Sequence, residues 1–246
     1  MSESLIHPRY PPEINARIAR LEALTRLETT VVNLPGADVR LAVIHPASID
    51  DLLDTVAHDP EFNLPYWAEI WPSGIALADA ILKDPALVRG KPVLELGCGL
   101  GITAAAATMV GAHLVATDYS PYSLLLTELT CLLAHQPPPQ VRQINWRAAD
   151  ADLLQRSGER WPVVLAADVI YEARDIEPVL AVLGRIVAPN GLVWLAEPGR
   201  EHASTALNLA RARGWQIEST THTGPWPGGP DGVVHLHKMI KAPAGD

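Results

Sequence analysis

A glycine-rich run with acidic neighbours contains the residues that could most directly do chemistry. The run VLELGCGLG places Gly97, Gly99 and Gly101 directly after a strand of buried type. Glycines let a backbone turn tightly and approach a ligand without an intervening Cβ. Asp118 ends the next expected strand, where a carboxylate can accept both hydroxyls of a ribose. This pattern predicts a site for a nucleoside cofactor.

Glu95, just before the glycines, indicates which nucleoside cofactor binds. A dinucleotide places a pyrophosphate over such a loop, and this carboxylate would repel it. S-adenosylmethionine places an ammonium group there, which a carboxylate attracts. The spacing G-x-G-x-G also departs from the dinucleotide pattern, which argues against a nicotinamide-dependent reductase. We therefore expect S-adenosylmethionine, with Asp150 as a candidate for binding the adenine amino group or, alternatively, as a helix cap.

A second set of candidate residues follows the next two core strands of the expected sheet. Asp168, Tyr171 and Glu172 come after one strand, and Glu197 and Arg200 after the next. Methyl transfer from a sulfonium is an in-line displacement, so the protein must align a nucleophile with the methyl group. If that nucleophile is the neutral amine of a lysine, as the resemblance described next implies, we expect Asp168 to orient it and Tyr171 to pack on its methylene stem, with Glu172, Glu197 and Arg200 binding substrate. The alternatives are a helix cap, a packing residue and a loop salt bridge.

These motifs resemble the class I, seven-strand methyltransferases that use S-adenosylmethionine, and within them the family 16 protein-lysine methyltransferases. The resemblance covers residues 64–200 and is carried by PYWAEIWPSG, by VLELGCGLG with Asp118, and by AADVIYE. It implies that Asp168 and Tyr171 lie at the substrate entrance. It implies these cofactor contacts: Trp71, Trp146, Gly97, Gly99, Asp118 and the backbone of Ala167.

The run AEPGR, residues 196–200, is similar to a DPGR stretch in one branch of that family. That branch methylates lysines on the β-subunit of electron-transfer flavoprotein. Glu197 stands here in place of Asp, and Cys98 stands where the branch commonly has Ser. The resemblance implies a protein substrate, with an electron-transfer flavoprotein, a ribosomal protein or another cytoplasmic protein as candidates.

Strict alternation of strands and helices from Trp71 onward must position these residues. It predicts an α/β fold with a doubly wound, mostly parallel seven-strand sheet, Rossmann-like in arrangement. The last two strands are expected to form an antiparallel hairpin. The expected strands are 91–96, 113–118, 141–145, 161–167, 191–197, 215–221 and 233–240, and the expected helices are 74–82, 102–110, 122–134, 176–187 and 203–213.

Residues 1–63 are expected to form an N-terminal extension to a methyltransferase domain of residues 64–246. A helix is predicted at 12–28 and a hairpin at 29–34 and 39–44. If the extension covers the site as a lid, the enzyme acts on a small molecule, by N- or O-methylation. If the groove stays open, a protein substrate is favoured. A catalytically silent cofactor-binding partner protein is the third possibility.

Composition indicates which classes of partner, location and metal site to expect. The formal net charge is -9 and no Lys/Arg run occurs, which argues against nucleic acid. No apolar stretch is long enough for a membrane helix, and no signal pattern opens the chain, so a cytoplasmic location is expected. The two cysteines are expected to be buried thiols. His222, His235 and His237 lack nearby carboxylate or cysteine ligands, so no metal is expected.

Overall fold

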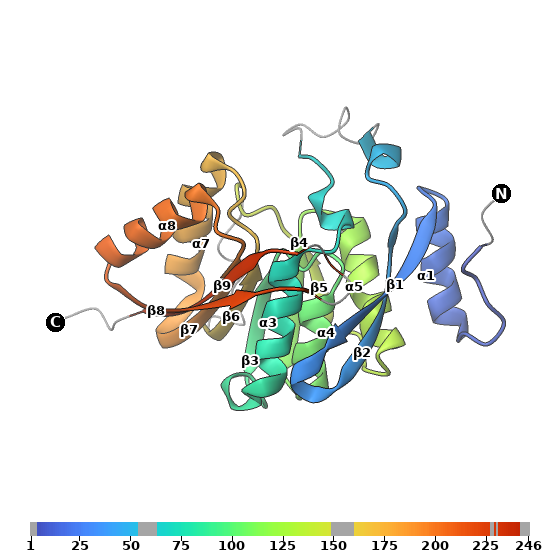
Figure 1. Cartoon of the computed structure of the whole chain (residues 1–246), viewed down its shortest axis with the longest axis horizontal. Helices are drawn as coiled ribbons and strands as arrows, with labels where there is room; N and C mark the ends of the chain where they lie inside the picture. The colour runs from blue at the N-terminus through green and yellow to red at the C-terminus, as the bar shows by residue number, and fades with distance from the viewer. Residues whose placement is uncertain (1–3, 54–62, 149–159, 227–228, 230, 242–246) are drawn as a thin grey trace.

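The computed structural model describes residues 4–53, 63–148, 160–226, 229 and 231–241, and Figure 1 shows its helices and strands. The helices are α1 (Pro12–Glu22), α3 (Pro72–Lys83), α4 (Ile102–Met109), α5 (Pro121–Leu133), α7 (Ile176–Ile186) and α8 (Glu201–Ala212). The strands are β1 (Leu27–Leu34), β2 (Val39–Pro46), β3 (Pro92–Leu96), β4 (His113–Asp118), β5 (Gln140–Gln143), β6 (Trp161–Ala167), β7 (Val187–Glu197), β8 (Trp215–Thr223) and β9 (Val233–Lys241).

Seven strands form one sheet in the order β5-β4-β3-β6-β7-β9-β8. Strands β3 to β7 pair in parallel, whereas β9 runs antiparallel to both β7 and β8. The predicted sheet and its closing hairpin are thereby confirmed. The connections after the neighbouring strands β3 and β6 run in opposite directions. A crevice opens outside the carboxyl ends of such strands, where open α/β sheets bind ligands.

Helices cover both faces of this sheet. Successive residues of a strand point to opposite faces, and both sets are apolar here, so each face packs against helices. In β3, Val93 joins the apolar cluster under α3, α4 and α5, while Leu94 and Leu96 join the cluster under α7 and α8. Figure 1 shows α7 and α8 on one side of the sheet and α3, α4 and α5 on the other. Alternation therefore turns Glu95 toward the α3–α5 face.

The N-terminal extension packs on that same face. Strand β2 and helix α1 both contact α5, and Arg17 pairs with Glu128 of α5 at 3.3 Å. The apolar side chains Ile14 and Ile18 belong to the cluster under α3, α4 and α5. Helix α1 ends earlier than predicted, because Leu27 already pairs with Pro46 in the β1–β2 hairpin. In Figure 1 the extension lies at the end of the molecule farthest from α8.

Strand β7 is longer than predicted, because it begins before Pro189, Asn190 and Gly191, three residues of types that favour a turn. Trp161 pairs with Val187, but the next pair is Val163 with Leu192, so extra residues of β7 bulge out of the ladder. Asn190 takes a left-handed conformation with a φ of 58°. The turn is thus present as a bulge inside a longer strand.

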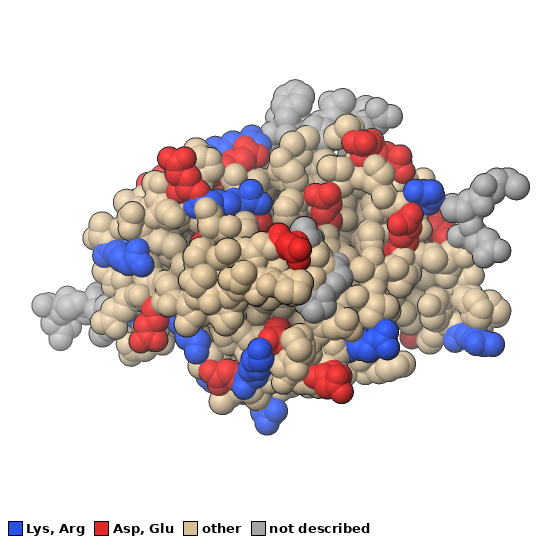
Figure 2. Space-filling view, viewed as in Figure 1, with Lys and Arg blue, Asp and Glu red and all other residues tan. Residues whose placement is uncertain are grey.

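The surface carries charges of both signs. In the view of Figure 2, blue and red side chains are interspersed, and no broad basic area covers that face. Within the described ranges, no helix combines the length and apolar character needed to cross a bilayer.

Candidate functional site

A cavity lies at the carboxyl ends of β3, β4 and β6, at the crevice predicted by the strand order. Its walls come from the glycine loop, the segment before α3, and the residues after β4, β6 and β7. Eleven of the predicted site residues line it: Trp71, Glu95, Gly97, Gly99, Asp118, Trp146, Ala167, Asp168, Tyr171, Glu172 and Arg200. Gly101 and Glu197 do not line it, and Asp150 lies outside the described residues. Their assigned roles stay predictions.

Two glycines shape the floor of the cavity. Gly97 and Gly99 have φ values of 67° and 51°, in the left-handed region that favours glycine. A Cβ on Gly97 would lie 3.0 Å from Val169 and 3.3 Å from the indole of Trp146. The backbone N–H of Gly99 donates to Asp118 Oδ2 at 3.0 Å. The loop therefore brings bare backbone, an indole face and a carboxylate to one place.

Two buried carboxylates line this cavity, and one of them lacks a hydrogen-bond donor among the described residues. Glu95 is 1% exposed, and its Oε2 has no hydrogen-bond partner among the described residues. Burial, and then the negative charge of Asp118, raise the pKa of Glu95 well above its ordinary value. Burial also raises the pKa of Asp118, although hydrogen bonds from the N–H groups of Ser120 and Gly99 oppose this. A buried acceptor without a donor fits a cationic ligand group, such as the ammonium of S-adenosylmethionine.

Gly101 has a packing role that its place in the motif did not reveal. Its φ is 79°, and an added Cβ would lie 2.5 Å from Cα of Thr127 on α5. The missing side chain lets the start of α4 approach the backbone of α5, which holds the glycine loop against the domain.

We expect Gly101→Ala to lower the free energy of unfolding by about 2–5 kcal/mol, through a left-handed alanine and an overpacked contact. Gly90→Ala is the matched control, since Gly90 has a φ of 68° but no atom within 4 Å of the position that a Cβ would take. It should cost only the conformational part, about 1–2 kcal/mol. Urea denaturation of both variants measures the difference, and equal losses would contradict the packing role.

Residues 66–71, the aromatic segment before α3, form a second wall of the cavity, and only part of this wall was predicted. Trp67 stacks on Tyr122 with ring centroids 6.0 Å apart, and Tyr66 meets Tyr171 edge-on at 5.3 Å. Trp71 Nε1 donates to the Tyr66 carbonyl at 2.8 Å. Trp67 lies in a short 3-10 helix and Trp71 just before α3, so they do not share one helix face. Tyr66 and Glu69 also line the cavity, and the run PYWAE was the available signal for them.

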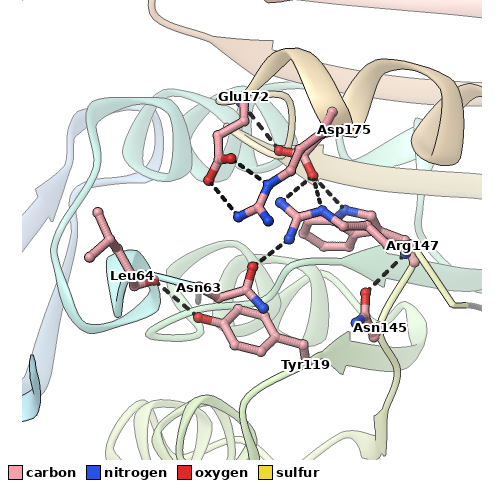
Figure 3. A network of polar contacts seen from close by, with 9 residues as sticks. Asn63, Leu64, Tyr119, Asn145, Arg147, Glu172 and Asp175 are labelled. Atoms are coloured by element: carbon pink, nitrogen blue, oxygen red, sulfur yellow. Dashed lines mark hydrogen bonds and ion pairs between the residues drawn. The ribbon is translucent and has the colours of Figure 1, made fainter. Parts of the chain in front are cut away.

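Polar contacts beside the cavity tie Asn63 and Leu64, just before the aromatic segment, to residues that follow β4, β5 and β6 (Figure 3). Asp175 is fully buried and accepts from Trp146 Nε1 at 3.3 Å and from Arg147 Nε at 2.7 Å. Arg147 also donates to Asn63, which precedes the aromatic segment. Tyr119 donates to the Leu64 carbonyl at 3.1 Å. None of these contacts was predicted, because the partners are far apart in the sequence.

Of the residues predicted to meet the substrate, Asp168, Tyr171, Glu172 and Arg200 line the cavity, where they follow the ends of β6 and β7. Asp168 has a φ of 55°, and its N–H donates to the Ala196 carbonyl of β7 at 2.8 Å. Its carboxylate forms two hydrogen bonds with Arg200, from Nε at 2.8 Å and from a terminal nitrogen at 2.9 Å. Glu172 pairs with Arg174 at 2.5 Å. Burial raises the pKa of Tyr171 above its ordinary value, so its hydroxyl keeps its proton at neutral pH.

The family model described as lysine methyltransferase matches residues 65–208. The electron transfer flavoprotein beta subunit lysine methyltransferase of Xenopus laevis is 34% identical over 200 residues, which are 79% of this chain and 76% of that protein. The protein of the same name from Homo sapiens is 38% identical over 109 residues, which are 44% of this chain and 39% of that protein. The match with the Danio rerio protein spans 52% of that protein.

Solved structures share the fold. The N-methyltransferase NodS from Bradyrhizobium japonicum WM9, in complex with S-adenosyl-L-homocysteine, aligns with a TM-score of 0.57 at 12% identity, covering 77% of this chain and 97% of that one. Magnesium protoporphyrin IX methyltransferase from Synechocystis PCC 6803, with bound S-adenosylmethionine, aligns with a TM-score of 0.53 at 15% identity, covering 69% and 78%.

Proposed function

Since the chain belongs to the lysine methyltransferase family and uses S-adenosylmethionine, we propose that it methylates a lysine side chain of a protein similar to the electron transfer flavoprotein beta subunit. The relatives' names support this choice of acceptor. The observation that carries the proposal is a single cavity lined both by Glu95, whose Oε2 has no partner among the described residues, and by the aromatic and acidic side chains of Tyr66, Tyr171 and Glu69.

When it is bound, the cofactor supplies a methyl group activated on a sulfonium. Different residues of the chain would hold its different parts. Glu95 would take the ammonium group, because its Oε2 lacks a donor. Asp118 would accept the ribose hydroxyls with the lone pairs that the N–H groups of Gly99 and Ser120 leave open. Gly97 and Gly99 offer backbone close to the ligand, and Trp146 gives it an apolar face.

At the other side of the cavity, Tyr171 and the carboxylates would receive the lysine. Tyr66 and Tyr171 supply aromatic surface for the lysine side chain, and Glu69 supplies negative charge for the approach of its ammonium group, whereas Glu172 is paired with Arg174. Asp168 is already paired with Arg200, so an incoming amine meets an ion pair rather than a lone carboxylate. The protonated hydroxyl of Tyr171 can hold the neutral amine by a hydrogen bond.

The position of the extension supports a protein acceptor over a small molecule. Helix α1 and the β1–β2 hairpin pack against α5, and no residue of 4–53 is among the described residues that line the cavity. The lid considered for a small-molecule enzyme therefore has no support in this part of the chain. A second, more open hollow beside the end of β2 shares Glu69 and Trp71 with the cavity, which leaves room for a polypeptide.

A direct test incubates the purified protein with S-adenosylmethionine and purified electron transfer flavoprotein, followed by peptide mass spectrometry. We expect methylation at one or a few lysines of the beta subunit. Calorimetric titration with S-adenosylmethionine, and with NADH as the comparison ligand, controls for cofactor binding. Cofactor binding with no methylation of any protein in a lysate would favour the silent partner protein, and label only in small molecules would favour a metabolite enzyme.

We also propose the cytoplasm as the place of action. Cys98 and Cys131 are buried free thiols, which suits a reducing compartment.

A further inference from the structure

Two histidines of the C-terminal hairpin, for which the sequence indicated no role, lie against the end of β7 and the turn that follows it. His237 of β9 is 4% exposed, and its ring nitrogens contact Ser219 Oγ of β8 at 2.7 Å and Glu197 Oε1 of β7 at 3.2 Å. His235 stacks on His237 with ring centroids 6.2 Å apart, and its ring lies 3.6 Å from the Cβ position of Gly199. The hairpin thus abuts the turn that follows β7.

Glu197 connects this hairpin to the turn at residues 198–200. Its Oε2 accepts the backbone N–H of Gly199 at 2.6 Å and that of Arg200 at 2.9 Å. Burial raises the pKa of Glu197, but the hydrogen bonds from His237 and from these two N–H groups more than offset burial and lower it. Glu197 is therefore an anion at neutral pH, and His237 donates to it from Nε2, because a carboxylate only accepts.

Arg200 extends from this turn to the substrate side of the cavity. Its guanidinium binds both oxygens of Asp168 and lies over the ring of Trp71, 5.6 Å from the ring centroid. A planar guanidinium can do both only in a narrow range of orientations. The direction of the Arg200 side chain depends on the position of its backbone, whose N–H donates to Glu197.

We propose that Glu197, braced by His237 and Ser219, is a positioning residue for methyl transfer: it aims Arg200 at Asp168 and thereby sets the geometry of the lysine entrance. The role of the entrance rests on the proposed function, whereas the aiming of Arg200 is a property of the chain alone. Glu197 does not need to touch the substrate, in contrast to the role that its motif predicted. The hairpin β8–β9 becomes a support of the site rather than only a cover for the sheet edge.

Arginine modification by phenylglyoxal tests the aiming of Arg200 without any methyl acceptor. Peptide mass spectrometry follows the rate at Arg200, with exposed Arg211 of α8 as the internal reference. In Glu197→Ala we expect Arg200 to react about tenfold faster, since hydrogen bonds to a charged group are lost. Glu197→Gln keeps an oxygen for both N–H groups and should stay near the wild-type rate. Thr220→Val, which alters a hydrogen bond with His222 on the same strand, is the matched control. An unchanged rate at Arg200 in Glu197→Ala would overturn the proposal.

Kinetics separate positioning from mere stability. For Glu197→Ala and His237→Phe we expect the KM for the protein acceptor to rise about tenfold, with the S-adenosylmethionine affinity and the number of cofactor sites unchanged. Glu197→Gln should restore most of the KM. A purely structural role would instead reduce the number of cofactor sites and leave KM unchanged, and that result would overturn the proposal. If the wild-type protein methylates no lysine, the proposed function fails while the phenylglyoxal result still decides the aiming of Arg200.

Discussion

Glu95→Gln is expected to weaken S-adenosylmethionine binding while leaving the cofactor-free protein at least as stable as wild type. The amide has the shape of the carboxylate but no charge for an ammonium group. Losing a charged hydrogen bond costs about 1.5–3 kcal/mol, which is about 10- to 150-fold in Kd. Without cofactor, the same substitution removes a buried carboxyl group whose Oε2 lacks a partner in the described residues. Calorimetry measures the Kd, and thermal unfolding measures the stability.

The stability difference should depend on pH with a definite sign. Burial, and then the charge of Asp118, raise the pKa of Glu95 in the folded protein. A carboxyl with a raised folded-state pKa stabilises the fold below its unfolded pKa, and this contribution is lost as pH rises through the folded pKa. The Tm advantage of Glu95→Gln should therefore grow as pH rises above the ordinary pKa of a glutamate toward the raised pKa of Glu95 in the folded protein. Glu218→Gln on exposed β8 is the control, and a pH-independent difference would contradict a charged, buried Glu95.

Asp168→Ala is expected to lower kcat/KM for the protein acceptor about a hundredfold, with cofactor affinity unchanged. The substitution leaves the Arg200 guanidinium uncompensated at the lysine entrance. At about 5 Å and an effective dielectric constant of about 20, it would repel the lysine ammonium by about 3 kcal/mol, which corresponds to that factor. Steady-state kinetics with the protein acceptor, alongside calorimetry, measure both parts.

The double variant Asp168→Ala/Arg200→Ala separates two roles of Asp168. If Asp168 acts by neutralising Arg200, removing both charges should restore most of the lost kcat/KM. If Asp168 itself orients the amine, the double variant should stay as slow as the single one. Asp168→Asn controls for the backbone, because asparagine tolerates the φ of 55° better than alanine does. Wild-type turnover by Asp168→Ala would contradict both roles.

The features that local spacing encodes could be predicted. Apolar runs that end at Leu96, Asp118 and Ala167 predicted the strands, and the alternation of strands with helices predicted a parallel sheet. Because parallel strands present their carboxyl ends at one edge, the glycine loop, Asp118 and Asp168 had to lie near one another. The cofactor and the family followed from these few positions.

Contacts between distant segments could be decided only by the tertiary structure. Arg200 reaches Asp168 across 32 positions and His237 reaches Glu197 across 40, and no spacing rule connects such pairs. For the same reason Gly101 was predicted at the ligand, whereas the closeness of α5 gives it a packing role. The periodicity of the strands and the glycines of the loop act through local preferences of the backbone. For this reason the sequence alone determined the fold class and the kind of ligand. The tertiary structure decided which side chains face that ligand and which residues hold those side chains in place, because both depend on how the sheet, its helices and the C-terminal hairpin pack together.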